Sequence, residues 1–90
     1  MLVALEEMKK YLRVDFDDDD ALIENLITTG KNLCKDIARL SADEFEKSHC
    51  SKIAVMYAVA YLYEHRENAD YKALTLSLRS LLFGIRKEGF

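Results

Sequence analysis

Aspartate residues provide the clearest candidate for a metal site in this sequence. Asp15, Asp17 and Asp19 have the alternating spacing with which an EF-hand calcium loop begins. Such a loop also needs a glycine at its sixth position and a bidentate glutamate at its twelfth, where this chain has Asp20 and Leu26. Because both key residues are missing, we interpret the aspartate run as the start of a helix, whose positive end favours carboxylates.

Cysteine and histidine offer no stronger site. His49 and Cys50 are the only adjacent pair of soft metal ligands, while Cys34 and His65 lie far away in the sequence. The chain has no C-x-x-C or H-x-x-x-H motif, and its three scattered glycines cannot form a phosphate-binding loop. A Cys–His hydrolase would also need a third group to orient the histidine. The sequence therefore predicts a protein that is not an enzyme and that uses neither a metal nor a cofactor.

The composition restricts the class of protein further. Half of the 90 residues are apolar, which excludes a disordered acidic tail. The 16 acidic and 13 basic residues give a net charge of −3, which disfavours a free-standing DNA-binding module. The longest uncharged apolar run, residues 53–63, is well short of the ~20 residues that span a bilayer. We therefore expect a soluble, intracellular, single-domain protein without a signal peptide or a membrane contact.

Apolar residues recur at helical spacing along most of the chain. The pattern predicts an all-α fold, a small bundle of about four helices with a basic C-terminal segment. We place the helices of this single domain, residues 1–90, near 2–12, 18–40, 42–66 and 77–86. Gly30 lies within the apolar stripe of the second helix, where glycine costs about 1 kcal/mol relative to alanine. We therefore expect another helix to pack closely against Gly30.

The third predicted helix has more apolar surface than one small chain can cover. Its second half, residues 53–63, has no polar side apart from tyrosine hydroxyls. A helix that is apolar all round is normally buried on every side, and a 90-residue chain has few other helices to enclose it. We interpret this segment as core on one side and subunit interface on the other, with Val55, Val59 and Leu62 as candidate interface residues.

Motifs along the whole chain resemble those of one protein family. Residues 5–15 (LEEMKKYLRVD), 18–27 (DDDALIENLI), 58–67 (AVAYLYEHRE) and 76–82 (LSLRSLL), followed by Arg86, occur in the order typical of the family. The chain resembles the head–tail connector proteins of tailed bacteriophages, also described as head-completion adaptors or DNA-packaging proteins. It departs from their pattern where Gly30 and Lys31 replace small alanines, where Ser77 replaces a proline, and in lacking a "TG" turn after the second helix.

This resemblance implies a structural role without chemistry. A connector of this family is expected to form a ring of about a dozen copies below the portal, which extends the channel for DNA during head completion. The implied partners are further copies of the chain, the portal protein, a downstream tail-side completion protein and double-stranded DNA that passes without specific contacts. The implied location is the virion, and the host cytoplasm during assembly.

Charge is distributed unevenly along the chain. The first 40 residues carry nine acidic and six basic residues, whereas residues 71–90 carry one acidic and four basic residues. A ring built from one kind of subunit joins two different surfaces of neighbouring copies. We therefore hypothesise that the two charged regions lie on opposing surfaces, between subunits or against the portal, although they are also compatible with plain solvated charges. The candidate residues are Asp17, Asp18 and Asp19 on one surface and Arg79, Arg86 and Lys87 on the other.

A second function remains open at this level. A small helical regulatory adaptor that binds one host or phage protein would have the same size and the same lack of catalytic residues. Such an adaptor would be a monomer or a dimer that recognises its partner through one helix in a groove.

Overall fold

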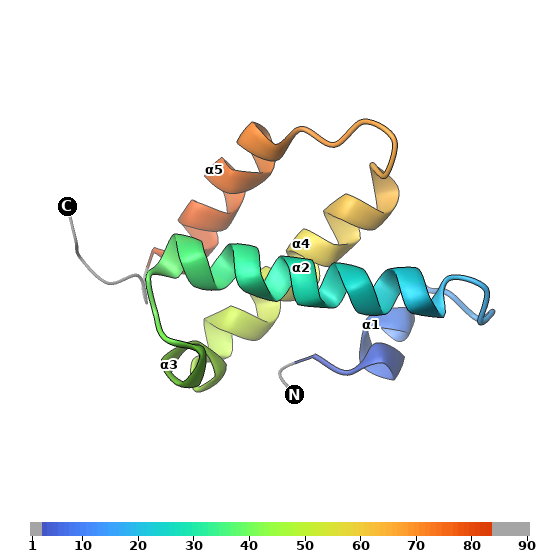
Figure 1. Ribbon diagram of the computed structural model, residues 1–90, viewed down its shortest axis with the longest axis horizontal. Helices are drawn as coiled ribbons and strands as arrows, with labels where there is room; N and C mark the ends of the chain where they lie inside the picture. The colour runs from blue at the N-terminus through green and yellow to red at the C-terminus, as the bar shows by residue number, and fades with distance from the viewer. Residues whose placement is uncertain (1–2, 84–90) are drawn as a thin grey trace.

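The computed structural model describes residues 3–83, except for the side chain of His49, and every regular element in that part is a helix (Figure 1). The predicted all-α bundle is confirmed. Its elements are α1 (Leu5–Leu12), α2 (Asp20–Ala38), α3 (Ala42–Glu46), α4 (His49–Glu64) and α5 (Tyr71–Leu82).

The long helix α2 crosses in front of α4 and α5, which form the layer behind it, while α1 and α3 lie below it towards opposite ends (Figure 1). The molecule measures 42 × 27 × 16 Å. A thickness of 16 Å corresponds to about two layers of helices, because packed helix axes lie about 8–10 Å apart. Within residues 3–83, α4 is therefore covered by α2 on one side and left uncovered on the opposite side.

The predicted third helix, 42–66, is interrupted. The first part, α3, begins with a capping box at Ser41, whose hydroxyl accepts a hydrogen bond from the Glu44 N–H while the Glu44 carboxylate accepts one from the Ser41 N–H. The chain then leaves the helix at Lys47 and Ser48, and Ser48 adopts an extended backbone as the N-cap of α4. This break lets the buried Phe45 pack into the core from a separate short helix.

The last helix begins earlier than predicted. We expected a loop followed by a helix over 77–86, but α5 starts at Tyr71. The side chain of Asp70 caps it by accepting a hydrogen bond from the Ala73 N–H at 3.0 Å. Leu74, Leu78 and Leu82 then share the buried side of the helix.

Gly30 lies where α2 packs tightly against α4, so the predicted close contact of another helix at this glycine is confirmed. A Cβ atom added at Gly30 would lie 3.3 Å from the Val59 Cγ2 atom and 3.5 Å from the Ala58 Cβ atom. The core around this crossing consists of buried residues from all five helices and from Val3: Val3, Met8, Ile23, Cys34, Ala38, Phe45, Ala54, Val55, Ala58, Val59, Leu62, Leu74, Leu78 and Leu82.

One polar side chain lies in this core without a partner. The Ser51 hydroxyl is fully buried and has no hydrogen-bond partner within the described part of the chain. An unpaired buried hydroxyl costs about 1–3 kcal/mol. We therefore expect Ser51→Ala to raise the free energy of unfolding by about 1 kcal/mol, measured by urea denaturation.

The matched control for Ser51 is Ser80→Ala on the exposed side of α5. This change should alter stability only by the difference in helix propensity, a few tenths of a kcal/mol. A Ser51→Ala variant that is less stable than the unmodified chain would contradict the burial of an unpaired hydroxyl.

Candidate interaction surfaces

The acidic corner (residues 15–20) is built around a buried lysine. The side chain of Lys9, from α1, is only 7% exposed, and its Nζ atom lies 2.7 Å from Asp17 Oδ1 and 2.8 Å from Asp20 Oδ1. The hydrogen bond that Lys9 donates to Asp17 raises the pKa of Lys9 most, and the one that it donates to Asp20 raises it further. The hydrogen bond from Lys9 in turn lowers the pKa of Asp17. The aspartate run therefore fastens α1 to the start of α2, besides lying at a helix N-terminus.

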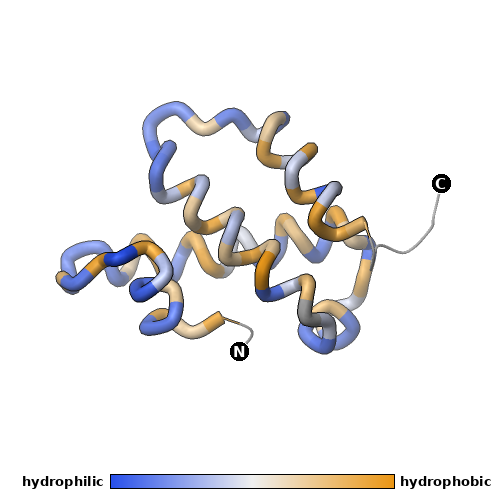
Figure 2. Tube along the Cα trace, turned by 180° about the vertical axis from the view of Figure 1, so that it is seen from behind, coloured by the Kyte–Doolittle hydropathy of each residue, from blue (hydrophilic) through white to orange (hydrophobic). Residues whose placement is uncertain are grey.

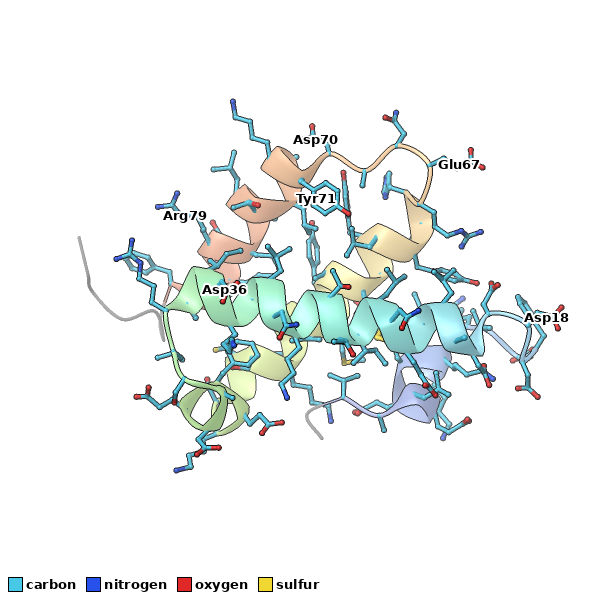
Figure 3. The ribbon with its side chains drawn as sticks, viewed as in Figure 1. Asp18, Asp36, Glu67, Asp70, Tyr71 and Arg79 are labelled. Carbon is cyan, nitrogen blue, oxygen red and sulfur yellow. The ribbon has the colours of Figure 1, made fainter. Side chains whose placement is uncertain are left out.

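Asp18 and Asp19 differ in their surroundings. Asp19 accepts a hydrogen bond from the hydroxyl of Tyr63, at the far end of α4, and this bond raises the pKa of Tyr63. Asp18 is exposed at one end of the long axis of the molecule (Figure 3). Within residues 3–83 there is no group of three or more histidine, cysteine or acidic residues arranged to hold a metal ion.

The pair between Lys9 and Asp17 predicts a pH-dependent contribution to stability. Because the hydrogen bond from Lys9 lowers the folded pKa of Asp17, its contribution is fully present at neutral pH and disappears as the pH falls below the ordinary aspartate range and through the folded pKa. We expect Lys9→Met to lower the melting temperature at pH 7 by several degrees. The loss of stability on acidification should also be smaller in this variant than in the unmodified chain.

The control is Lys10→Met, which removes an exposed lysine next to Lys9. Glu7 and Glu46 also have lowered pKa values, through Lys52 and Lys31, and their contributions cancel when the variants are compared. Parallel pH profiles for Lys9→Met and the unmodified chain would contradict the stabilising role of the pair.

The candidate interface residues of α4 lie inside the chain. Val55 and Val59 are completely buried and Leu62 is 3% exposed, because this side of α4 packs against α2 and α5. The assignment of these three residues to a surface between subunits is therefore wrong. The side of α4 that residues 3–83 leave uncovered carries Ile53, 62% exposed, and Tyr57, 39% exposed.

The exposed side of α5 combines basic and large apolar residues. Lys72, Leu76, Arg79 and Phe83 follow one another at helical spacing, and all four are exposed. We call these four residues the α5 stripe. Leu76 is 58% exposed and Phe83 is 80% exposed, on the side opposite the buried leucines. Arg86 and Lys87, which we expected to belong to the same basic surface, lie outside the described residues.

The two charged regions are far apart in one chain. Asp18 and Arg79 lie near opposite ends of the long axis (Figure 3). Seen from behind, hydrophobic residues follow α4 and α5, while the connection between α4 and α5 is mainly hydrophilic and the connection before α2 alternates hydrophilic and hydrophobic residues (Figure 2). The structure thus separates the predicted acidic residues from Arg79, and adds exposed apolar residues at both places: Phe16 in the corner, and Leu76 and Phe83 on α5.

Nucleophilic side chains and cavities add little to these surfaces. Cys34 is buried in α2, and burial raises the pKa of its thiol to about 12. Cys50 is exposed on α4. An open groove of about 480 Å³ runs between the starts of α1 and α3 along α2, where Leu5, Ile27 and Lys31 contribute to its lining. Lys31 forms an ion pair with Glu46 at 3.0 Å.

Of the comparisons with known proteins, the one with protein families gives a match. No curated protein and no solved structure matches it. None of the helices in the described part is long and apolar enough to span a membrane. The family model for the phage gp6-like head-tail connector protein matches residues 3–88, which is nearly the whole chain. The ordered motifs, the all-α fold and this match agree, and the chain belongs to the family of phage gp6-like head-tail connector proteins.

Proposed function

We propose that the chain is a head–tail connector subunit that forms a ring of about a dozen copies below the portal and extends the DNA channel during head completion. The match to the connector family over residues 3–88 carries this proposal. Membership of this family indicates a structural component of the virion that associates with other virion proteins. The portal above the ring, a tail-side completion protein below it and further copies of the chain are the proposed partners, and the host cytoplasm is the proposed place of assembly.

The shape of the chain supports association with other copies. It is 16 Å thick, and its most apolar helix, α4, leaves Ile53 and Tyr57 exposed on the side that no other helix of the described part covers. Large apolar side chains on a small protein mark contact surfaces when they lie together on one side. The net charge of −3 favours a DNA channel without tight phosphate contacts.

The charged residues supply candidate contact positions. Asp17 and Asp18 are both exposed, but Asp17 also pairs with Lys9, and the half-buried Asp19 binds Tyr63, so Asp18 is the acidic candidate most available for a contact. Together with Arg79, Arg86 and Lys87 they are proposed to face neighbouring subunits or the portal. Exposed ion pairs contribute only about 0.2–1 kcal/mol each, so they would determine register while apolar contacts supply affinity.

The test uses portal protein from the phage that encodes the chain. Negative-stain images of portal with the added chain should show an extra ring on one end of the portal. Arg86→Glu should weaken its attachment, whereas Lys47→Glu, an exposed change of equal charge, should not. Absence of an added ring with the unmodified chain would overturn the proposed function, and equal attachment of both variants would remove Arg86 from the contact.

A further inference from the structure

We infer that the acidic corner of one copy docks, through Phe16 and its flanking aspartates, onto the α5 stripe of a second copy. This inference rests on the proposed function, since it names the two surfaces through which copies associate. The contact joins two different surfaces and so repeats from copy to copy.

The corner presents an exposed apolar side chain between acids. Phe16 is 50% exposed and lies between Asp15 and Asp17, with Asp18 following. The loop around it is held on both sides, since the Val14 N–H donates to the Lys9 carbonyl at 2.9 Å and Lys9 Nζ binds Asp17 at 2.7 Å. The backbone that carries the exposed Phe16 is therefore held before any contact forms, which reduces the entropy lost on binding.

The α5 stripe presents the opposite charge around two apolar side chains. Leu76 and Phe83 lie seven residues apart, or about 10 Å along the helix, and Arg79 lies between them. Lys72 extends the stripe by one turn, and residues 71–83 contain no acidic residue. Aromatic and arginine side chains are the types that most often dominate binding energy at interfaces.

The two surfaces match in both charge and apolarity. Phe16 can cover Leu76 and Phe83, while Asp15 and Asp18 face the two cations of the stripe. Each surface places its charged groups beside the apolar centre, so the contact has the buried centre and polar rim of a protein interface. Because this contact is small, two free copies should bind each other weakly and transiently. Affinity increases when many copies meet at once.

Geometry prevents the two surfaces from meeting within one molecule. Asp18 and Arg79 lie near opposite ends of a molecule 42 Å long (Figure 3). When two copies join, a corner and a stripe therefore remain free at the two ends of the pair. Further copies add in the same orientation until the arrangement closes on itself.

The first experiment reverses charge on each surface separately and measures self-association by sedimentation velocity up to about 1 mM protein. The variants are Asp15→Lys with Asp18→Lys, and Lys72→Glu with Arg79→Glu. Each variant alone brings like charges together, so its association constant should fall at least about tenfold. An equimolar mixture pairs opposite charges again at every contact, and should return to within about threefold of the unmodified chain.

Matched controls carry the same net charge as these variants at other exposed positions. Glu24→Lys with Asp36→Lys, and Lys10→Glu with Lys47→Glu, should associate like the unmodified chain. An unmodified chain that stays monomeric over the whole range, or controls that lose association as strongly as the corner and stripe variants, would overturn the inference.

The second experiment establishes that the contact is head-to-tail. Phe16→Ser and Phe83→Ser should each be monomeric, because each lacks one of the two surfaces. Their mixture has one intact corner and one intact stripe, and should form a pair that grows no further. Failure of the mixture to pair would overturn the inference. Attachment to portal, measured separately, tests the proposed function: association lost with portal binding retained leaves that function standing.

Discussion

Replacing Gly30 with leucine is expected to lower the free energy of unfolding by about 3 kcal/mol, after the gain in helix propensity of about 1 kcal/mol has been included. A first carbon at Gly30 already lies 3.3 Å from the Val59 side chain, and the Val55 carbonyl oxygen is 3.6 Å away. The remaining atoms of leucine have no space unless α2 and α4 separate. Urea denaturation followed by circular dichroism measures this loss.

Two further variants separate the effect of size from the effect of helix propensity. Gly30→Ala gains helix propensity, while Val59 must move by a few tenths of an ångström, so stability should change by less than about 1 kcal/mol. Thr29→Leu places the same leucine on the exposed side of α2 and should be close to neutral. If Gly30→Leu is as stable as Thr29→Leu, then α2 and α4 do not approach as described.

Val59→Asp and Ile53→Asp, on the same helix, should have very different effects. Val59 is completely buried, so Val59→Asp places an unpaired carboxylate in the core and should lower the free energy of unfolding by about 4 kcal/mol or more. Ile53 is 62% exposed, so Ile53→Asp should change stability by less than about 1 kcal/mol. Thermal denaturation of the two purified variants measures both effects.

This comparison identifies which side of α4 faces the core. Its control is Tyr57→Asp, at a second uncovered position, which should resemble Ile53→Asp. A stable Val59→Asp variant together with an unfolded Ile53→Asp variant would reverse the assignment of inner and outer sides of the helix.

The inner side of α4 could not be read from the sequence. A helix that is apolar all round has no polar side to mark solvent, so periodicity does not distinguish Val59 from Ile53. The choice depends on where α2 packs, and the close approach at Gly30 is the one local sign of it. The prediction of a glycine contact was confirmed, whereas the interface residues chosen on α4 were wrong.

The predicted helix limits agree with the structure at the start of α3 but not at the starts of α4 and α5. The helix predicted near 42–66 begins correctly after Ser41, the first residue of a capping box, but the predicted limits pass over Ser48 and Asp70, the residues before α4 and α5. Aspartate three residues before Ala73 is the signal that marks the start of α5. Leu74, Leu76 and Leu78 fit a strand as well as a helix, and this ambiguity hid the true start.

The role of the aspartate run was only partly predictable. Its place at the start of a helix followed from local rules, and Asp19 is the residue before α2. Its partners Lys9 and Tyr63 come from other helices, and Tyr63 is 44 positions away in the chain. The spacing of aspartates within the run contains no information on such tertiary partners. The attachment of α1 to the start of α2 through Lys9 could therefore not have been predicted.

The 16 Å thickness has a thermodynamic consequence for any assembly of these chains. A fold this thin keeps much of its apolar surface near solvent, so its stability alone is small for its length. Each neighbour that binds only the folded form adds free energy to folding by mass action. Denaturation midpoints should therefore rise with protein concentration, and the chain should resist heat and protease better within a particle than in dilute solution.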